Sequence, residues 1–136
     1  MRVLAIDYGT KRIGIAVSDP TGTLAVPLET IPATPFDKFL ERLRQIIQEK
    51  EVSLILVGMP RSLSGEYGES ANKVREFVDA LKETIHVPIK TWDERLTTVQ
   101  AQRSMLETGE KTKSFKKKID RMAAAVLLQS YLDSRG

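Results

Sequence analysis

Apolar and polar residues follow one another along the chain in a pattern that predicts five strands and four helices. Three apolar, β-branched segments come first, and the short turn sequences between them predict an antiparallel meander. Later apolar runs predict two more strands, and apolar positions three and four residues apart predict helices. The predicted strands are 2–8, 12–18, 24–31, 52–59 and 88–92, and the predicted helices are 36–47, 71–81, 97–107 and 115–134.

The order of these elements, βββαβαβαα, predicts the fold class. A hairpin meander followed by two βα crossovers gives a mixed five-stranded α/β sheet with helices on its faces, an order that matches the ribonuclease H-like fold. Thr34 is a candidate N-cap for the first helix, and Pro35 suits its first turn. We expect residues 1–136 to form a single domain, because domains usually contain roughly 100 to 200 residues.

The composition removes several kinds of chemistry. The chain has no Cys and one His, which excludes thiolate nucleophiles, zinc–thiolate sites and histidine-clustered metal sites. What remains is carboxylate chemistry. No apolar run approaches the ~20 residues of a membrane span, and Asp7 interrupts the first apolar segment, so we expect no signal peptide and a cytoplasmic protein.

Positive charge is concentrated near the C-terminus. The formal net charge is +3, yet the stretch 109–121 alone holds six cations against two acids. Such a patch attracts a polyanion, although a solvated basic loop is the alternative interpretation. The cations are Lys111, Lys113, Lys116, Lys117, Lys118 and Arg121.

Asp7 is the first candidate site residue. Strand alternation places it on the same face as Val3 and Ala5, where a charge is unusual. Gly9 and Gly14 bracket the following hairpin, and their missing side chains would let a phosphate or a metal-bound water approach the backbone. The alternative is a turn-initiating Asp with two turn glycines.

A second acid follows the fifth predicted strand. Asp93 and Glu94 stand where the C-terminal ends of parallel strands present ligand-binding residues. Alternation sends the two side chains to opposite faces, so only one of them shares a site with Asp7. The residues alone do not decide between them.

Asp120 is the third candidate. In the last predicted helix it lies on the same face as Ala123, Ala124 and Leu127, so its carboxylate continues an apolar stripe. The alternative is an acid in the first helical turn that complements the helix dipole.

Three converging carboxylates would repel one another and so require a cation. Two unit charges 4 Å apart interact by about 4 kcal/mol at an effective dielectric of 20. Oxygen ligands select Mg²⁺ or Mn²⁺, and two such ions can activate a water and stabilise the leaving oxygen in phosphodiester hydrolysis. The pattern therefore predicts a metal-dependent nuclease.

The sequence resembles the YqgF (RuvX) family of Holliday junction resolvase-like proteins, which are also described as pre-16S ribosomal RNA nucleases with a ribonuclease H-like fold. Four stretches spread over nearly the whole chain carry the resemblance. They are the run 7–14 with Ala16, Ser18 and Asp19; the run 58–60 with Gly65 and Gly68; the run 93–98; and Ile119 and Asp120 with Ala123, Ala124, Leu128, Gln129, Tyr131 and Leu132.

This resemblance implies roles for the acids. It maps catalytic and metal-binding residues onto Asp7, Glu94 and Asp120, which favours Glu94 over Asp93. The implied activity is trimming of the precursor of small-subunit ribosomal RNA, with ribosomal particles as possible partners. Resolution of four-way DNA junctions is the alternative, because fold does not determine substrate.

Cations that flank these acids in sequence are candidate phosphate contacts. Such contacts position a nucleic acid strand without reading its sequence. As long, flexible side chains, those nearest Asp7 and Glu94 could equally be solubilising surface residues. The candidates are Lys11, Arg12, Arg95, Lys116, Lys117, Lys118 and Arg121.

Two rival functions use the same residues differently. One is nucleotide binding of the actin and sugar-kinase type, although those proteins need two such domains and this chain supplies one. The other is a non-catalytic RNA-binding module in ribosome assembly, against which the presence of all three acids weighs. We interpret Phe36, Phe39 and Trp92 as core residues and expect no base-stacking role for them.

Overall fold

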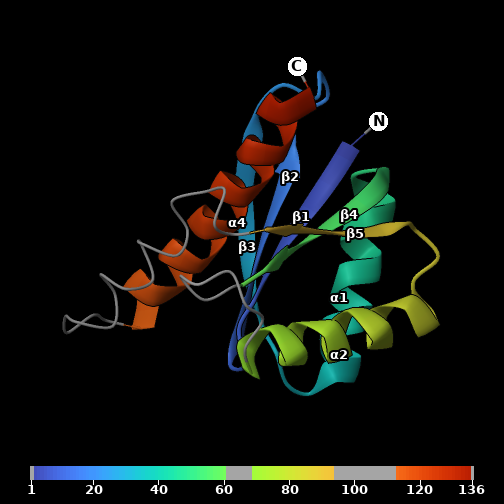
Figure 1. Cartoon of the computed structure of the whole chain (residues 1–136), viewed down its shortest axis with the longest axis vertical. Coiled ribbons are helices and arrows are strands. Elements are labelled where there is room, and N and C mark those ends of the chain that lie inside the picture. Colours follow the sequence, from blue (N-terminus) through green and yellow to red (C-terminus); the bar gives the residue numbers. More distant parts are fainter. Residues whose placement is uncertain (1, 61–68, 94–112, 136) are drawn as a thin grey trace.

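A mixed five-stranded sheet forms the centre of the structure, with the strand order β3-β2-β1-β4-β5 (Figure 1). The computed structural model describes residues 2–60, 69–93 and 113–135. The first three strands are antiparallel neighbours, whereas β4 is parallel to both β1 and β5, which confirms the predicted meander and mixed sheet. The strands are β1 (Arg2–Tyr8), β2 (Arg12–Ser18), β3 (Ala25–Pro32), β4 (Val52–Met59) and β5 (Ile89–Asp93).

Helices cover both faces of this sheet (Figure 1). The helices α1 (Phe36–Glu49) and α2 (Glu69–Thr84) lie on one face, and α4 (Lys113–Arg135) lies on the other. The predicted helix 97–107 lies outside the described residues. Within the residues described, no helix is sufficiently long and apolar to span a membrane.

The predicted cap of the first helix is wrong. Pro35, and not Thr34, is the N-cap residue of α1, and no side chain caps the helix with a hydrogen bond. The fixed φ of proline suits a helix start, which allows α1 to begin at Phe36 without a capping hydroxyl.

Two apolar cores form because successive strand residues point to opposite faces. Leu4 and Ile6 of β1 pack under α1 and α2. Val3 and Ala5 pack under α4, with the small residues Ala123 and Ala124 of that helix among their neighbours. Strand β1 is thus buried on both sides, and its apolar residues alternate between the two cores.

Two residues that contribute to the family resemblance have structural roles. The hydroxyl of Ser18, which is almost fully buried, accepts a hydrogen bond from the backbone N–H of Val3 at 2.9 Å. Asp19 closes the β2–β3 turn by accepting bonds from the Thr21 hydroxyl and from the backbone N–H groups of Thr23 and Leu24. The bond from Thr21, followed by those from the backbone, lowers the pKa of Asp19.

We predict that Ser18→Ala lowers the free energy of unfolding by about 1–3 kcal/mol, because it leaves the buried N–H of Val3 without an acceptor. Urea denaturation measures this loss. Ser53→Ala is the matched control, because the Ser53 hydroxyl is exposed, and it should change the same quantity by less than about 0.5 kcal/mol. Equal effects of the two substitutions would contradict the prediction.

Candidate active site

The carboxylate of Asp7 lies in the α4 face of the sheet, near the C-terminal end of β1. Asp7 is only 3% exposed, and its Oδ1 atom is shielded from solvent. Its register partner on β2 is Gly14, so both residues face the same side of the antiparallel pair. Since Val3 and Ala5 also face α4, the predicted placement of Asp7 is confirmed.

Gly14 allows α4 to approach the sheet beside Asp7. A Cβ atom at Gly14 would overlap the backbone carbonyl of Asp120. The hydrogen of glycine therefore leaves the space in which α4 packs. We expected this glycine to admit a phosphate or a water, but the structure shows that the backbone of Asp120 fills the space. The Asp7–Gly14 pair thus joins the opening strand to the first part of the closing helix.

Arg12 forms an ion pair with Asp120. Its Nε donates a hydrogen bond of 2.7 Å to Asp120 Oδ2 across 108 positions of sequence. The two side chains are 27% and 18% exposed, so the pair is partly shielded from water. Arg12 and Gly14 both lie on β2, two residues apart and hence on one face, which explains how the strand contacts both the backbone and the side chain of Asp120.

This ion pair changes the electrostatics expected for the site. The sequence predicted carboxylates whose mutual repulsion would require a metal ion. A guanidinium at 2.7 Å supplies a positive charge from the chain itself, and it holds one carboxylate oxygen in a fixed direction. Asp120 is therefore positioned near the sheet by a side chain of the protein itself.

The third acid can be followed only in part. Asp93 ends β5 opposite Met59, which belongs to the α1/α2 core, whereas the preceding Trp92 packs on the α4 side. Asp93 thus points away from the face of Asp7. Glu94 lies outside the described residues, and among those that are described no cluster of three His, Cys, Asp or Glu could hold a metal ion.

The candidate cations are distributed unevenly. Lys11 is exposed in the β1–β2 turn, and Arg121, next to Asp120, is half-buried. Arg95 lies outside the described residues. The backbone of Lys116, Lys117 and Lys118 is helical, within the first part of α4. Part of the basic stretch therefore belongs to the same helix as Asp120.

Sequence reasoning missed the partner of Asp120. The sequence places Arg12 with Lys11 among the candidate phosphate contacts, because no local pattern connects two residues 108 positions apart. A signal was nevertheless present, since Arg12 and Gly14 occupy alternate positions on the strand that pairs with Asp7. With α4 placed over that strand, alternation directs Arg12 toward the helix.

The strand order and the helices on both faces of the sheet are those of a ribonuclease H-like fold, and the comparisons with known proteins identify the family. Residues 1–134 match the family described as "RuvX: Holliday junction resolvase". Relatives named "Putative pre-16S rRNA nuclease" include one from Desulforamulus reducens, 48% identical over 134 residues (98% of each chain), and one from Thermoanaerobacter pseudethanolicus, 46% identical over 136 residues (99% of this chain and 98% of the relative). The chain belongs to the RuvX family, which is a family of nucleases.

Solved structures support the same fold. Thermus thermophilus RuvC superposes with a TM-score of 0.59 at 15% identity, covering 99% of this chain and 96% of its own. The fowlpox virus resolvase in complex with Holliday junction DNA gives a TM-score of 0.54 at 10% identity, covering 99% of both chains. The ribonuclease H-like fold predicted from the element order is thereby confirmed.

We predict that Gly14→Ala lowers the free energy of unfolding by at least about 2 kcal/mol, because the added methyl group displaces α4 from the sheet. Gly22→Ala is the comparison, since Gly22 has a φ of 74° but no atom within 4 Å of an added Cβ. It should cost about 1 kcal/mol through backbone strain alone. A Gly14→Ala cost no greater than that of Gly22→Ala, measured in urea, would contradict the close approach.

We also predict that Arg12 and Asp120 are energetically coupled. A double-mutant cycle with Arg12→Ala and Asp120→Asn should give a coupling energy of about 1–2 kcal/mol, because the bond is charge-assisted and partly shielded. Chemical denaturation of the four proteins without metal measures it. Additive effects of the two substitutions would show that the pair contributes nothing to the fold in solution.

Proposed function

We propose that this chain is a metal-dependent nuclease that trims the precursor of small-subunit ribosomal RNA during ribosome assembly in the cytoplasm, with residues 1–136 acting as one domain. One observation supports it most. Asp7 pairs with Gly14, and the backbone of Asp120 packs against Gly14, so both acids lie on one face of the sheet. The names of the relatives from D. reducens and T. pseudethanolicus point to the same substrate.

The proposed metal ligands are Asp7, Glu94 and Asp120. The donors are all carboxylate oxygens, a set that suits Mg²⁺ or Mn²⁺, and two ions would match the chemistry of phosphodiester cleavage. Asp93, the other candidate, lies on the opposite face from Asp7, and the family resemblance favours Glu94 as the third ligand. When bound, such ions activate a water and stabilise the leaving oxygen.

The side chains of the protein prepare this chemistry. Asp7 is held in a buried position at the end of β1, where the surrounding apolar residues restrict access of water. Arg12 orients Asp120 and reduces its repulsion with Asp7. We assign phosphate binding to Lys11, Arg95, Lys116, Lys117, Lys118 and Arg121. We also assign it to Arg12, because Arg12 lies beside Asp120.

Cleavage of four-way DNA junctions is the second candidate function. The description of the matching family as a Holliday junction resolvase favours it. The same acids would serve either substrate, because both reactions hydrolyse a phosphodiester bond and differ in the strands that the surface must hold.

We predict that Asp7→Asn lowers the rate of cleavage by roughly 100-fold or more while leaving RNA affinity nearly unchanged, because the binding cations lie elsewhere. Labelled ribosomal RNA precursor and a four-way DNA junction, each with Mg²⁺ or Mn²⁺, provide the assay. Asp79→Asn is the matched control, because Asp79 is exposed on α2. Undiminished cleavage by Asp7→Asn would remove the site assignment, and cleavage of the junction alone would favour the second function.

A further inference from the structure

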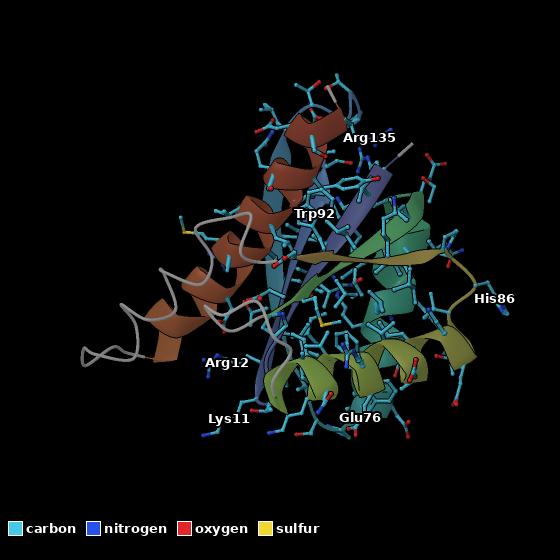
Figure 2. All side chains as sticks on the ribbon, viewed as in Figure 1. Lys11, Arg12, Glu76, His86, Trp92 and Arg135 are labelled. Atoms are coloured by element: carbon cyan, nitrogen blue, oxygen red, sulfur yellow. The ribbon has the colours of Figure 1, made fainter. Side chains whose placement is uncertain are left out.

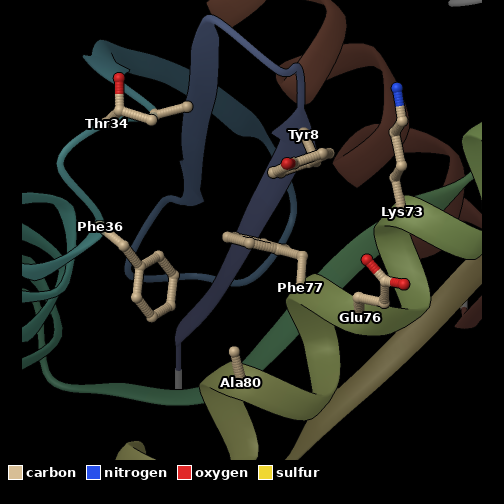
Figure 3. A pocket seen from close by; sticks show the side chains of 8 residues that line it. Tyr8, Thr34, Phe36, Lys73, Glu76, Phe77 and Ala80 are labelled. Carbon is tan, nitrogen blue, oxygen red and sulfur yellow. The ribbon is translucent and has the colours of Figure 1, made fainter.

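A hollow lined by aromatic rings lies close to the candidate active site. It has a volume of about 290 Å³, and Tyr8, Phe36 and Phe77 contribute rings to its lining. Figure 3 shows these rings coming from β1, from the start of α1 and from α2, with Glu76 next to Phe77 on α2. This volume is at the lower end of the range for small-ligand pockets, which suits one small ring system.

The rings are held rigidly by one another. The Tyr8 and Phe77 rings are 4.5 Å apart between centroids, and Phe36 meets Phe77 edge-on at 6.2 Å. Phe77 is in turn supported by Phe39, which is fully buried, at 5.6 Å. Tyr8 and Phe36 are only half-buried. The hollow therefore presents aromatic surface whose orientation is fixed before a ligand arrives.

Strand alternation connects this hollow to the candidate active site. Asp7 and Tyr8 are consecutive at the end of β1, so their Cα atoms are about 3.8 Å apart. Asp7 faces α4, whereas Tyr8 packs against the core under α1 and α2. A nucleic acid strand that crosses the end of β1 with a phosphate at Asp7 can therefore place a neighbouring base on the side of Tyr8.

The polar groups around the hollow suit the edge of a base. Glu76 and Lys73 both line it, so the lining holds one acid and one cation. The Glu76 carboxylate can accept hydrogen bonds from the N–H groups of a nucleobase edge, and the Lys73 ammonium can donate one to a base carbonyl or ring nitrogen. The carbonyl of Lys11 accepts a hydrogen bond from Ala33, another lining residue, which places the exposed Lys11 turn beside the hollow. Figure 2 shows Lys11 and Arg12 together at one end of the molecule.

We infer that the hollow binds one unpaired nucleobase of the strand whose phosphate lies at Asp7. This inference rests on the proposed function and narrows it, because a base inside a duplex cannot reach the hollow. The substrate is then a single-stranded stretch of nucleic acid, as at an RNA end, and a fully paired four-way junction lacks the base that the hollow takes. It also revises our expectation that the aromatic residues serve only the core.

Binding measured without divalent metal tests this inference, because no strand is cut under those conditions. Fluorescence anisotropy would follow a short unpaired RNA, the same RNA in a blunt duplex, and the same RNA with abasic positions. The variants are Phe36→Leu and Tyr8→Leu, which remove an aromatic face but keep apolar volume. Tyr131→Leu is the matched control, since Tyr131 is a buried aromatic residue of the core on the α4 face, where its ring meets that of Trp92.

Phe36→Leu and Tyr8→Leu should each raise the Kd for the unpaired RNA roughly fivefold or more through lost stacking. Tyr131→Leu should lower the melting temperature, because Tyr131 is buried, but should leave this Kd unchanged. For the duplex and for the abasic RNA, the Kd and its salt dependence should each be the same in all four proteins, because the phosphate contacts remain.

Equal Kd values for unpaired RNA in wild type, Phe36→Leu and Tyr8→Leu would overturn the inference. A loss of affinity that the duplex or Tyr131→Leu also shows would overturn it too. So would variants that change the oligomeric state and leave the affinity for RNA unchanged, because the hollow would then be a contact between copies. Failure of the proposed function gives a different result. In that case the unpaired RNA still distinguishes the variants, but the wild type with Mg²⁺ or Mn²⁺ cuts nothing.

Discussion

The close approach of α4 to β2 at Gly14 is the contact on which the candidate active site depends. Asp7 and Asp120 are 113 positions apart, and they share a face because a glycine, paired with Asp7, leaves space for the backbone of the helix. A second attachment lies further along α4. The Gln129 side chain accepts a hydrogen bond from the backbone of Ala25 and donates one to that of Thr23, which holds the helix against the start of β3.

Arg12 gives the site a stable arrangement when no metal ion is bound. Buried or partly buried carboxylates destabilise a fold unless a positive charge or hydrogen-bond donors compensate them. The guanidinium of Arg12 provides both for Asp120. A bound cation would then join an already oriented carboxylate. One strand, β2, supplies both the space for the helix and the charge that positions its acid.

Most of the fold follows from the hydrophobic pattern. The bounds of β1, β2 and β4 were predicted to the residue, because strands buried on both faces or alternating strictly have clear limits. Asp7 was placed on its face by alternation alone. The start of α1 at Phe36 agrees with the predicted helix, but its cap was mispredicted, because Thr34 resembles a cap whereas Pro35 occupies that position. The Arg12–Asp120 pair and the ring-lined hollow were not predicted, since both join residues that are brought together only by the packing of helices on the sheet.

The central claim is that Asp7 and Asp120 belong to one divalent-ion site. Titration of the metal-free protein with Mn²⁺, with the free ion followed by electron paramagnetic resonance, tests it most directly. We expect Asp7→Asn and Asp120→Asn each to weaken binding of the same ions by roughly tenfold or more, since a ligand charge is lost, while Asp79→Asn binds as the wild type does. Mn²⁺ binding that is unaffected by either substitution, or that responds to only one of them, would contradict the claim.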